Sequence, residues 1–196
     1  MLGWKKIIYK EPVSGLHKFL PWAMFVAPGV ILQKDGLLQK TYCVRGPDLD
    51  AASPESIHGV SMSFNSAVKR LGNGWTISAE TQSTSVNSYN GSKFYNQAAF
   101  LFDYERRLRF KEYGQHYEKY HYFTFVYKLE RATISKVKGA ITGEQNEEKN
   151  ASKEIEQFIQ TTRDIMGTIA DKIVVWEIDD SETLSYLHSS LSFNWF

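Results

Sequence analysis

The sequence contains a single cysteine, Cys43, among its 196 residues. One thiol can form neither an internal disulfide framework nor a cysteine-based zinc site, so both of these stabilising devices are excluded. Cys43 lies among apolar and β-branched residues, in a strand where a thiol is usually inert. This cysteine content fits a reducing, cytoplasmic environment.

The sequence also lacks an excess of charge of either sign, since 23 Lys and Arg residues balance 22 Asp and Glu residues. The overall charge therefore favours neither a polyanion nor a membrane surface as the partner. Long apolar runs are missing too: "FLPWAMFVAPGVIL" is broken by Pro21 and Pro28 and is shorter than the roughly 20 residues that a membrane span needs. "MLGWKKIIYK" does not have the pattern of a signal peptide, so we expect a cytoplasmic chain without a membrane span.

Hydrophobic periodicity and turn signals predict a chain of alternating strands and helices. Two β-prone runs around "KDG" predict a hairpin over residues 29–46. Ser53 and Pro54 suit the first positions of a helix, whose apolar stripe continues to residue 71. The same signals predict strands at 75–82, 120–129 and 173–178, helices at 97–112 and 151–171, and a last helix that begins at Asp179 with capping-box spacing to Glu182.

Polar segments separate these elements. Residues 83–93 are predicted to form a loop and residues 131–150 a long exposed loop, while residues 1–19 are interpreted as an N-terminal arm. The predicted fold class is α+β, or mixed α/β. It has one central sheet, largely antiparallel or mixed, with a β-hairpin near the N-terminus and about four helices packed on it. The whole chain, 1–196, is interpreted as one domain.

Apolar spacing also predicts which face each helix buries. In the helix at 97–112, three residues are expected to face inward: Leu101, Tyr104 and Leu108. In the last helix the inward stripe is expected to consist of Leu184, Leu187 and Leu191. One short helix and its tail cannot bring all the nearby aromatic residues to the same core, namely Tyr186, Phe193, Trp195 and Phe196. We therefore expect some of these aromatic side chains to be exposed and to mark a contact.

Four stretches between residues 20 and 192 carry a family resemblance. They are "LPWAMFVAPGVILQKDGLLQKTYCVRGPDLD", "RLGNGWTISAETQ", "FLFDYERRLRF" and "ETLSYLHSSLS". In this order they resemble the amino-terminal part of the VirB/TrbE/CagE family of type IV secretion (conjugal transfer) ATPases, and they are most similar to the TrbE branch. The resemblance implies a cytoplasmic ATPase, peripheral to the bacterial inner membrane, that powers conjugative transfer or secretion and assembles into oligomers.

In the family that the sequence resembles, hydrolysis is carried out by a later RecA-like domain. This chain has neither a "GxxxxGK[ST]" motif nor any Gly-Lys pair, so the backbone cradle and lysine that hold phosphates are missing. We expect no catalytic residue and no cofactor in this chain, with ATP and Mg²⁺ bound in the C-terminal ATPase domain. We also expect the chain to end where its domain meets that ATPase part.

The histidines do not predict a metal site. His116 and His121 are five residues apart, and on a strand they would point to opposite faces of the sheet. His188 is interpreted as a boundary residue that hydrogen-bonds to the backbone, although the resemblance places it in the family's "YLHS" motif.

The strongest basic feature is "ERRLRFKE", residues 105–112, with Arg106, Arg107 and Arg109. Nearby carboxylates can neutralise much of this charge through i,i+4 pairing, which favours a solvated helix face. The alternative is a docking surface for an acidic partner or a nucleic-acid-handling module. We expect DNA binding to be weak and without sequence preference.

Trp22 and Phe25 also have two interpretations: they cover an edge of the sheet, or they form an exposed apolar contact for a small inner-membrane subunit. The candidate partner interface therefore comprises Trp22, Phe25, Arg106, Arg107, Arg109, Tyr186, Trp195 and Phe196. The predicted function is a non-catalytic domain that docks the ATPase to inner-membrane subunits and supports its oligomerisation. Its expected partners are the C-terminal ATPase domain of the same protein, those subunits and a second copy.

Overall fold

The computed structural model describes residues 15, 18–46, 52–129 and 145–192. Within these residues it contains the following elements in chain order: β1 Trp22–Ala27, β2 Val30–Gln33, β3 Leu37–Arg45, α1 Pro54–Val68, β4 Trp75–Val86, α2 Gln97–Glu112, β5 His116–Lys128, α4 Gln145–Ile169, β6 Val174–Glu177 and α5 Asp180–Leu191.

The strands of the described residues form one sheet of six, with the order β1-β2-β3-β5-β4. Every pair is antiparallel, and β6 pairs with the end of β3, over Tyr42–Arg45. β2 and β3 form an antiparallel hairpin joined by the "KDG" turn, where Gly36 has a positive φ of 86°. The predicted α+β class, with its N-terminal hairpin and antiparallel sheet, is confirmed.

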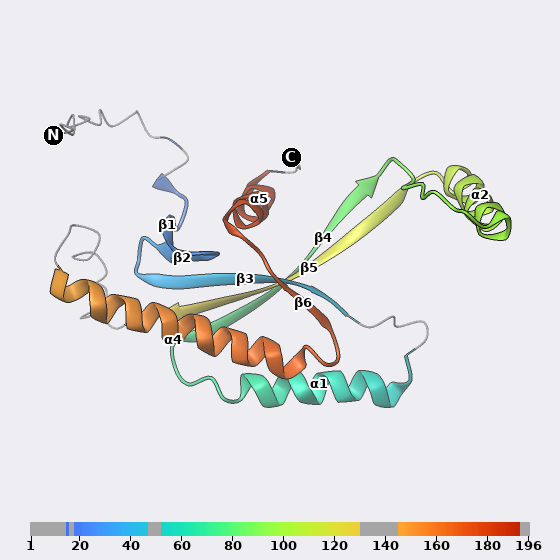
Figure 1. Cartoon of the computed structure of the whole chain (residues 1–196). Helices are drawn as coiled ribbons and strands as arrows, with labels where there is room; N and C mark the ends of the chain where they lie inside the picture. The colour runs from blue at the N-terminus through green and yellow to red at the C-terminus, as the bar shows by residue number, and fades with distance from the viewer. Residues whose placement is uncertain (1–14, 16–17, 47–51, 130–144, 193–196) are drawn as a thin grey trace.

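The sheet is covered on both faces (Figure 1). Helices α1 and α4 lie along one face, where Phe64 and Ile165 belong to the same apolar cluster as Tyr42 and Phe125. Helix α5 lies on the other face. The period-2 alternation of the strands therefore supplies apolar side chains to both layers.

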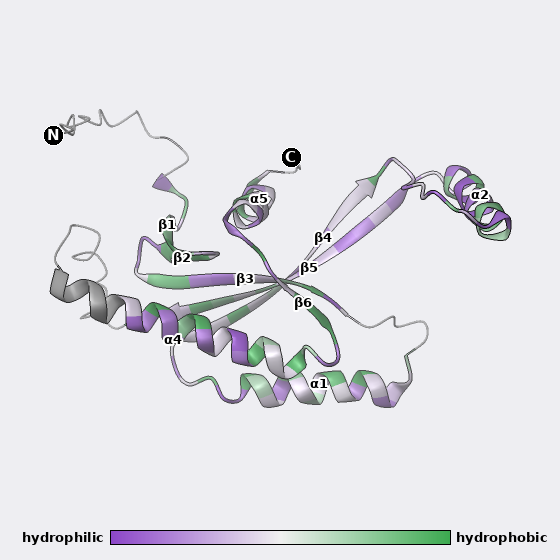
Figure 2. Ribbon diagram, viewed as in Figure 1, coloured by the Kyte–Doolittle hydropathy of each residue, from purple (hydrophilic) through white to green (hydrophobic). Residues whose placement is uncertain are grey.

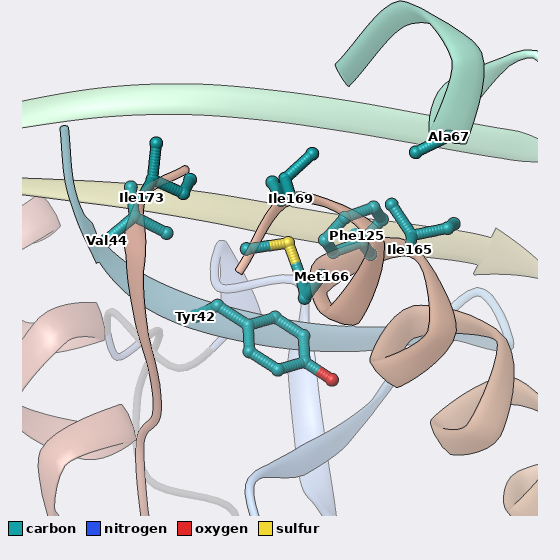
Figure 3. Close-up of a cluster of buried hydrophobic side chains, with 8 residues drawn as sticks. All are labelled: Tyr42, Val44, Ala67, Phe125, Ile165, Met166, Ile169 and Ile173. Carbon is teal, nitrogen blue, oxygen red and sulfur yellow. The ribbon is translucent and has the colours of Figure 1, made fainter. Parts of the chain in front are cut away.

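The largest cluster lies between the sheet and helices α1 and α4 (Figure 3). Tyr42 and Phe125 are almost fully buried there, and their rings meet edge to face at 5.9 Å between centroids. The hydroxyl of Tyr42 is hydrogen-bonded to that of Thr162 in α4 at 2.9 Å. Burial raises the pKa of the Tyr42 hydroxyl and so keeps the phenol neutral, while the bond to Thr162 gives the buried hydroxyl a partner.

The predicted starts of α1 and α5 are confirmed. Ser53 caps α1 by accepting a hydrogen bond from the backbone N–H of Ser56, and Pro54 follows at the first helical position. Asp179 and Glu182 form a reciprocal capping box at the start of α5, with bonds of 2.8 and 2.9 Å. These local signals act within one turn, so they do not depend on the rest of the fold.

Strands β4 and β5 are longer than predicted. β4 continues to Val86, through part of the segment predicted as a loop, and β5 already begins at His116. β3 pairs with β5 only as far as His121. Beyond that residue β4 and β5 form a two-stranded ribbon that carries α2 at its tip (Figure 1). We call residues 82–120 the arm.

Two further predictions differ from the structure. Helix α4 begins at Gln145, so the last residues of the predicted loop 131–150 are helical, and residues 131–144 lie outside the described residues. The predicted inward stripe of α5 is wrong at two of its three positions. Leu187 is buried, but Leu184 and Leu191 are 55% and 48% exposed, because Thr183 and Tyr186 occupy the face that meets the sheet. The predicted N-terminal arm, 1–19, lies almost entirely outside the described residues.

Candidate functional site

The arm ends in a helix that does not pack into a core. Asn96 caps α2 by accepting a hydrogen bond from the backbone N–H of Ala98. Gly114, with a φ of 77°, follows the last turn and returns the chain to β5. None of the residues of α2 is buried. The ribbon of β4 and β5 is therefore long enough to carry α2 beyond the helices that cover the sheet.

One side of α2 holds the helix on the arm. The hydroxyl of Tyr89 donates to Asp103 at 2.6 Å, which raises the pKa of that phenol. Asp103 also pairs with Arg107 at 3.6 Å, and the Arg107 guanidinium lies 5.6 Å from the centre of the Tyr89 ring. Phe110 stacks on His116 of β5, with 3.7 Å between ring centroids. These contacts fix which side of α2 faces away from the arm.

Four apolar side chains lie on the outward side of α2, and we call them the α2 stripe: Phe100, Leu101, Tyr104 and Leu108. Their exposed fractions are between 46% and 62%. Phe100 and Tyr104 stack with centroids 6.3 Å apart, as i,i+4 neighbours do on a helix. The prediction that Leu101, Tyr104 and Leu108 face inward is wrong, because α2 has no sheet face beneath it. Exposed apolar side chains that lie together on one helix make the α2 stripe a candidate contact surface.

The arginines of α2 are exposed but largely paired. Arg107 pairs with Asp103 as described above, and Arg109 contacts Glu105 at 2.7 Å, both at i,i+4 spacing. Arg106 is exposed on the same helix. The pairing predicted from the sequence is confirmed for two of the three arginines. The helix therefore presents less free positive charge than its sequence suggests.

Trp22 and Phe25 lie on β1 rather than on a free surface. Both are half-buried and pack against the cluster that contains Tyr186 and Leu187 of α5. Of the two interpretations from the sequence, the one in which they cover an edge of the sheet is observed. Met24, between them, is 40% exposed.

Tyr186, one of the residues of the candidate partner interface, is buried between the sheet and α5. Its side chain is 7% exposed and stacks near Tyr122, with 4.6 Å between ring centroids. Its hydroxyl donates to Glu80 at 2.9 Å and is 3.2 Å from the hydroxyl of Thr124. Burial raises the pKa of Tyr186 to about 12. Trp195 and Phe196 lie outside the described residues.

A cavity of about 770 Å³ lies beside α5, where β3 ends and β5 continues. Its lining mixes aromatic, polar and charged side chains and includes Cys43, whose pKa is raised by burial and by the nearby Glu182 carboxylate. A thiol with a raised pKa is a poor nucleophile, and none of the described residues that line the cavity is a histidine.

The histidines of β5 point to opposite faces, as predicted. His121 is hydrogen-bonded to Thr81, whereas His116 is bonded to the carbonyl of Phe110. His188 is exposed and bonds to the hydroxyl of Ser192 rather than only to backbone. In the described part of the chain, no three His, Cys, Asp or Glu side chains are placed to share a metal ion.

Comparison with known protein families assigns this chain to one of them. The model of "Type IV secretion system ATPase VirB4/TrbE, N-terminal domain" matches residues 29–134, which is more than half of the chain. The chain belongs to the VirB4/TrbE family. The matched range begins at the turn before β2 and runs past the end of β5, so it includes the whole arm. The sequence resemblance to the amino-terminal part of these type IV secretion ATPases is confirmed.

Two curated proteins show the same relationship. "Conjugal transfer protein TrbE" of Rhizobium radiobacter is 26% identical over 169 residues, which cover 84% of this chain but 21% of that protein. The first part of a "Probable conjugal transfer protein TrbE" of Sinorhizobium fredii is 31% identical over 116 residues, or 58% of this chain and 78% of that protein. The chain thus spans about a fifth of the first VirB4/TrbE relative and most of the second.

The surface that the sequence did not reveal in this VirB4/TrbE domain is the α2 stripe. Its residues have the spacing of a buried helix face, and spacing alone cannot distinguish a core from a partner. The Ser- and Thr-rich sequence that precedes α2 could have indicated its exposure, since this sequence offers little apolar surface for a helix to cover.

Among the described residues, none of the helices of the domain is both long and apolar enough to cross a membrane.

Proposed function

We propose that this chain is the non-catalytic assembly domain of a conjugal transfer ATPase, which docks the motor to inner-membrane subunits and supports its oligomerisation. The observation that carries the proposal is the α2 stripe, displayed on an arm that projects from the sheet (Figure 1). Burying one large apolar side chain contributes about 1.5 to 3 kcal/mol, and α2 gains little of this within its own chain. A partner protein would supply the missing burial.

A non-catalytic role fits the chemistry of the chain. The sequence has no phosphate-cradling motif, and the cavity that contains Cys43 holds a thiol with a raised pKa. In this proposal ATP and Mg²⁺ act in the C-terminal ATPase domain, which Trp195 and Phe196 would contact. The domain itself would work in the cytoplasm, peripheral to the inner membrane, and would reach the membrane through protein contacts.

The alternative, a nucleic-acid-handling role for residues 105–112, finds less support. Arg107 and Arg109 already pair with carboxylates of the same helix, so phosphates would have to compete for them. α2 also exposes four large apolar side chains beside its charged ones, and Figure 2 shows this mixed hydropathy along the helix.

Docking can be tested by recruitment to membranes. The purified chain would be mixed with inverted inner-membrane vesicles from cells that carry the transfer genes and from cells that lack them. We expect binding only to the first kind, and we expect the double variant Leu101→Glu with Leu108→Glu to lose it, because the charges disrupt the α2 stripe. The measurement is the fraction of chain that floats with the vesicles in a density gradient.

The matched control places the same charges on another helix. Ile57 and Met62 of α1 are 42% and 57% exposed, so Ile57→Glu with Met62→Glu should bind like the wild type. Equal binding to vesicles with and without the transfer subunits would overturn the docking proposal. So would an equal loss in both double variants.

A further inference from the structure

Strand β4 is an outer strand of the sheet, and the direction of its backbone groups can be derived. The N–H of Lys128 donates to the carbonyl of Gly74, the residue directly opposite in the β4–β5 register. In an antiparallel pair, residues that exchange hydrogen bonds alternate with residues that do not. The even-numbered residues of β4 therefore bond to β5. The odd-numbered residues, Trp75 to Ser85, direct their N–H and C=O groups to the other side of β4, where no strand of the described residues pairs with it.

The two edges of the sheet are built differently. β1 is short, lies between Pro21 and Pro28, and has two irregularities in its pairing with β2. Such features prevent an edge strand from pairing with another chain. β4 has none of them: its register with β5 is regular from Trp75 to Val86, and it contains neither proline nor lysine. Six of its twelve residues are Ser or Thr, and five of those six are exposed; the β-branched threonines suit a strand.

We propose that β4 pairs antiparallel with β4 of a second copy across a two-fold axis, joining two sheets into one. This inference rests on the assembly role proposed above and specifies one of its contacts. The open groups belong to odd-numbered residues, so the register must place odd residues opposite odd residues. Two such registers keep almost all of β4 paired. One places Glu80 opposite its own copy, and the other places Thr81 on the axis.

Charge selects the second register. Glu80 is the sole charged residue of β4, and like charges directly opposite each other destabilise a strand pair. With Thr81 on the axis, Glu80 lies opposite Gln82 of the other copy. Within one chain Gln82 already donates to Glu80 at 2.8 Å, so the same amide and carboxylate are compatible across the axis. A second copy therefore offers β4 a partner without repulsion.

The size of this contact predicts its strength. A strand of this length extends for about 40 Å, and an edge about 10 Å thick would bury on the order of 400 Å² per copy. A standard stable interface buries about 800 Å² per partner, so pairing through β4 should be weak and concentration-dependent. It should be detectable for the isolated chain and should strengthen when other contacts of the ATPase hold two copies together.

Sedimentation velocity from micromolar to millimolar concentration tests the contact. Thr81→Lys places two lysines opposite each other on the axis, and we expect it to weaken dimerisation at least several-fold. Thr81→Val is the matched control, since it also loses the hydrogen bond to His121 but adds no charge. It should dimerise like the wild type. A monomeric wild type, or equal dimerisation of all three proteins, would overturn the proposal.

Cross-linking tests the register. In a Cys43→Ser background, Thr81→Cys should give a covalent dimer with a short bis-maleimide, whereas Thr76→Cys, opposite Val86 of the other copy, should not. Dimers that are lost in Leu101→Glu but retained in Thr81→Lys would show that the α2 stripe, not β4, joins the copies. Vesicle recruitment of Thr81→Lys separates the two proposals: retained recruitment leaves docking intact when pairing through β4 fails.

Discussion

At the scale of single residues, a buried lysine ties three elements together. Lys40 of β3 is 2% exposed, and its ammonium lies 3.3 Å from a carboxylate oxygen of Glu177 in β6. Arg163 of α4 donates two hydrogen bonds to the same carboxylate, at 2.6 and 3.0 Å. The bonds from Arg163 and the nearby Lys40 charge lower the pKa of Glu177. Glu177 therefore compensates a charge that would otherwise be buried alone.

Replacing this carboxylate should be costly. Glu177→Gln leaves the Lys40 ammonium buried without its ion-pair partner, and we expect a loss of about 2 kcal/mol in the free energy of unfolding, because Glu177 itself is partly exposed to solvent. Arg163→Gln removes the exposed partner only and should cost about 1 kcal/mol or less. Urea denaturation of the three proteins at neutral pH measures both. Equal losses in the two variants would contradict a special role for Lys40.

The same carboxylate predicts a pH dependence. The pKa of Glu177 is lowered on folding, so its stabilising contribution is complete above the unfolded value of about 4.5 and is lost as the pH falls through the folded value. The stability gap between wild type and Glu177→Gln should therefore be constant from neutrality down to about pH 5 and shrink on further acidification. A gap that widens in acid would show the opposite linkage.

At the scale of elements, α5 is anchored by a turn far away in the sequence. Gly29, between β1 and β2, has a φ of 65°, and its N–H donates to the Asp180 carboxylate at 2.6 Å. A Cβ at this position would lie 2.7 Å from the carbonyl oxygen of Ile178. Glycine is needed here for both its backbone conformation and its lack of a side chain. The turn thus positions the start of α5 on the sheet.

Gly29→Ala should loosen this anchor. The strained φ alone costs about 1 to 3 kcal/mol, and the contact with Ile178 adds to it. Gly46→Ala is the control, because no atom lies within 4 Å of its added Cβ, and it should leave stability nearly unchanged. Thermal unfolding measures the cost, and amide exchange should show faster opening of α5 in Gly29→Ala alone. Similar stability of both variants would argue against the anchor.

At the scale of the whole molecule, one pair of strands serves two purposes. The inner halves of β4 and β5 belong to the covered sheet, and their outer halves form the arm that carries α2. Figure 2 shows the change in composition, since the outer part of β5 is hydrophilic where helices no longer cover it. The described residues are thus divided into a packed body and an extended arm.

The motifs that the sequence lacks predict how the isolated chain behaves toward nucleotide. Without the Gly-rich loop and its lysine, no backbone cradle is available for phosphates, so we expect the chain neither to bind nor to hydrolyse ATP. Calorimetry with Mg-ATP and a phosphate-release assay measure the two activities. Micromolar binding that competes with ADP would contradict the non-catalytic assignment.

The features that the sequence predicts correctly depend on neighbours in the chain. The caps at Ser53 and Asp179 and the "KDG" hairpin need only residues within one turn. The family could also be identified from its ordered motifs, as the match over residues 29–134 confirms. The loop predicted for the polar residues 83–93 is wrong in its first part. β4 continues through these Ser- and Thr-rich residues because β5 supplies their backbone partners.

What a helix packs against was decided only by the tertiary structure. The α2 stripe has the apolar spacing of a core helix, yet it is exposed because β4 and β5 extend beyond β3. In α5, the same kind of spacing predicted that Leu184 and Leu191 are buried, but both are exposed. Tyr186 packs on the sheet instead, and its hydroxyl contacts Glu80 and Thr124. Periodicity fixes the angle between side chains on one helix, but the covering surface depends on strands that are distant in the sequence.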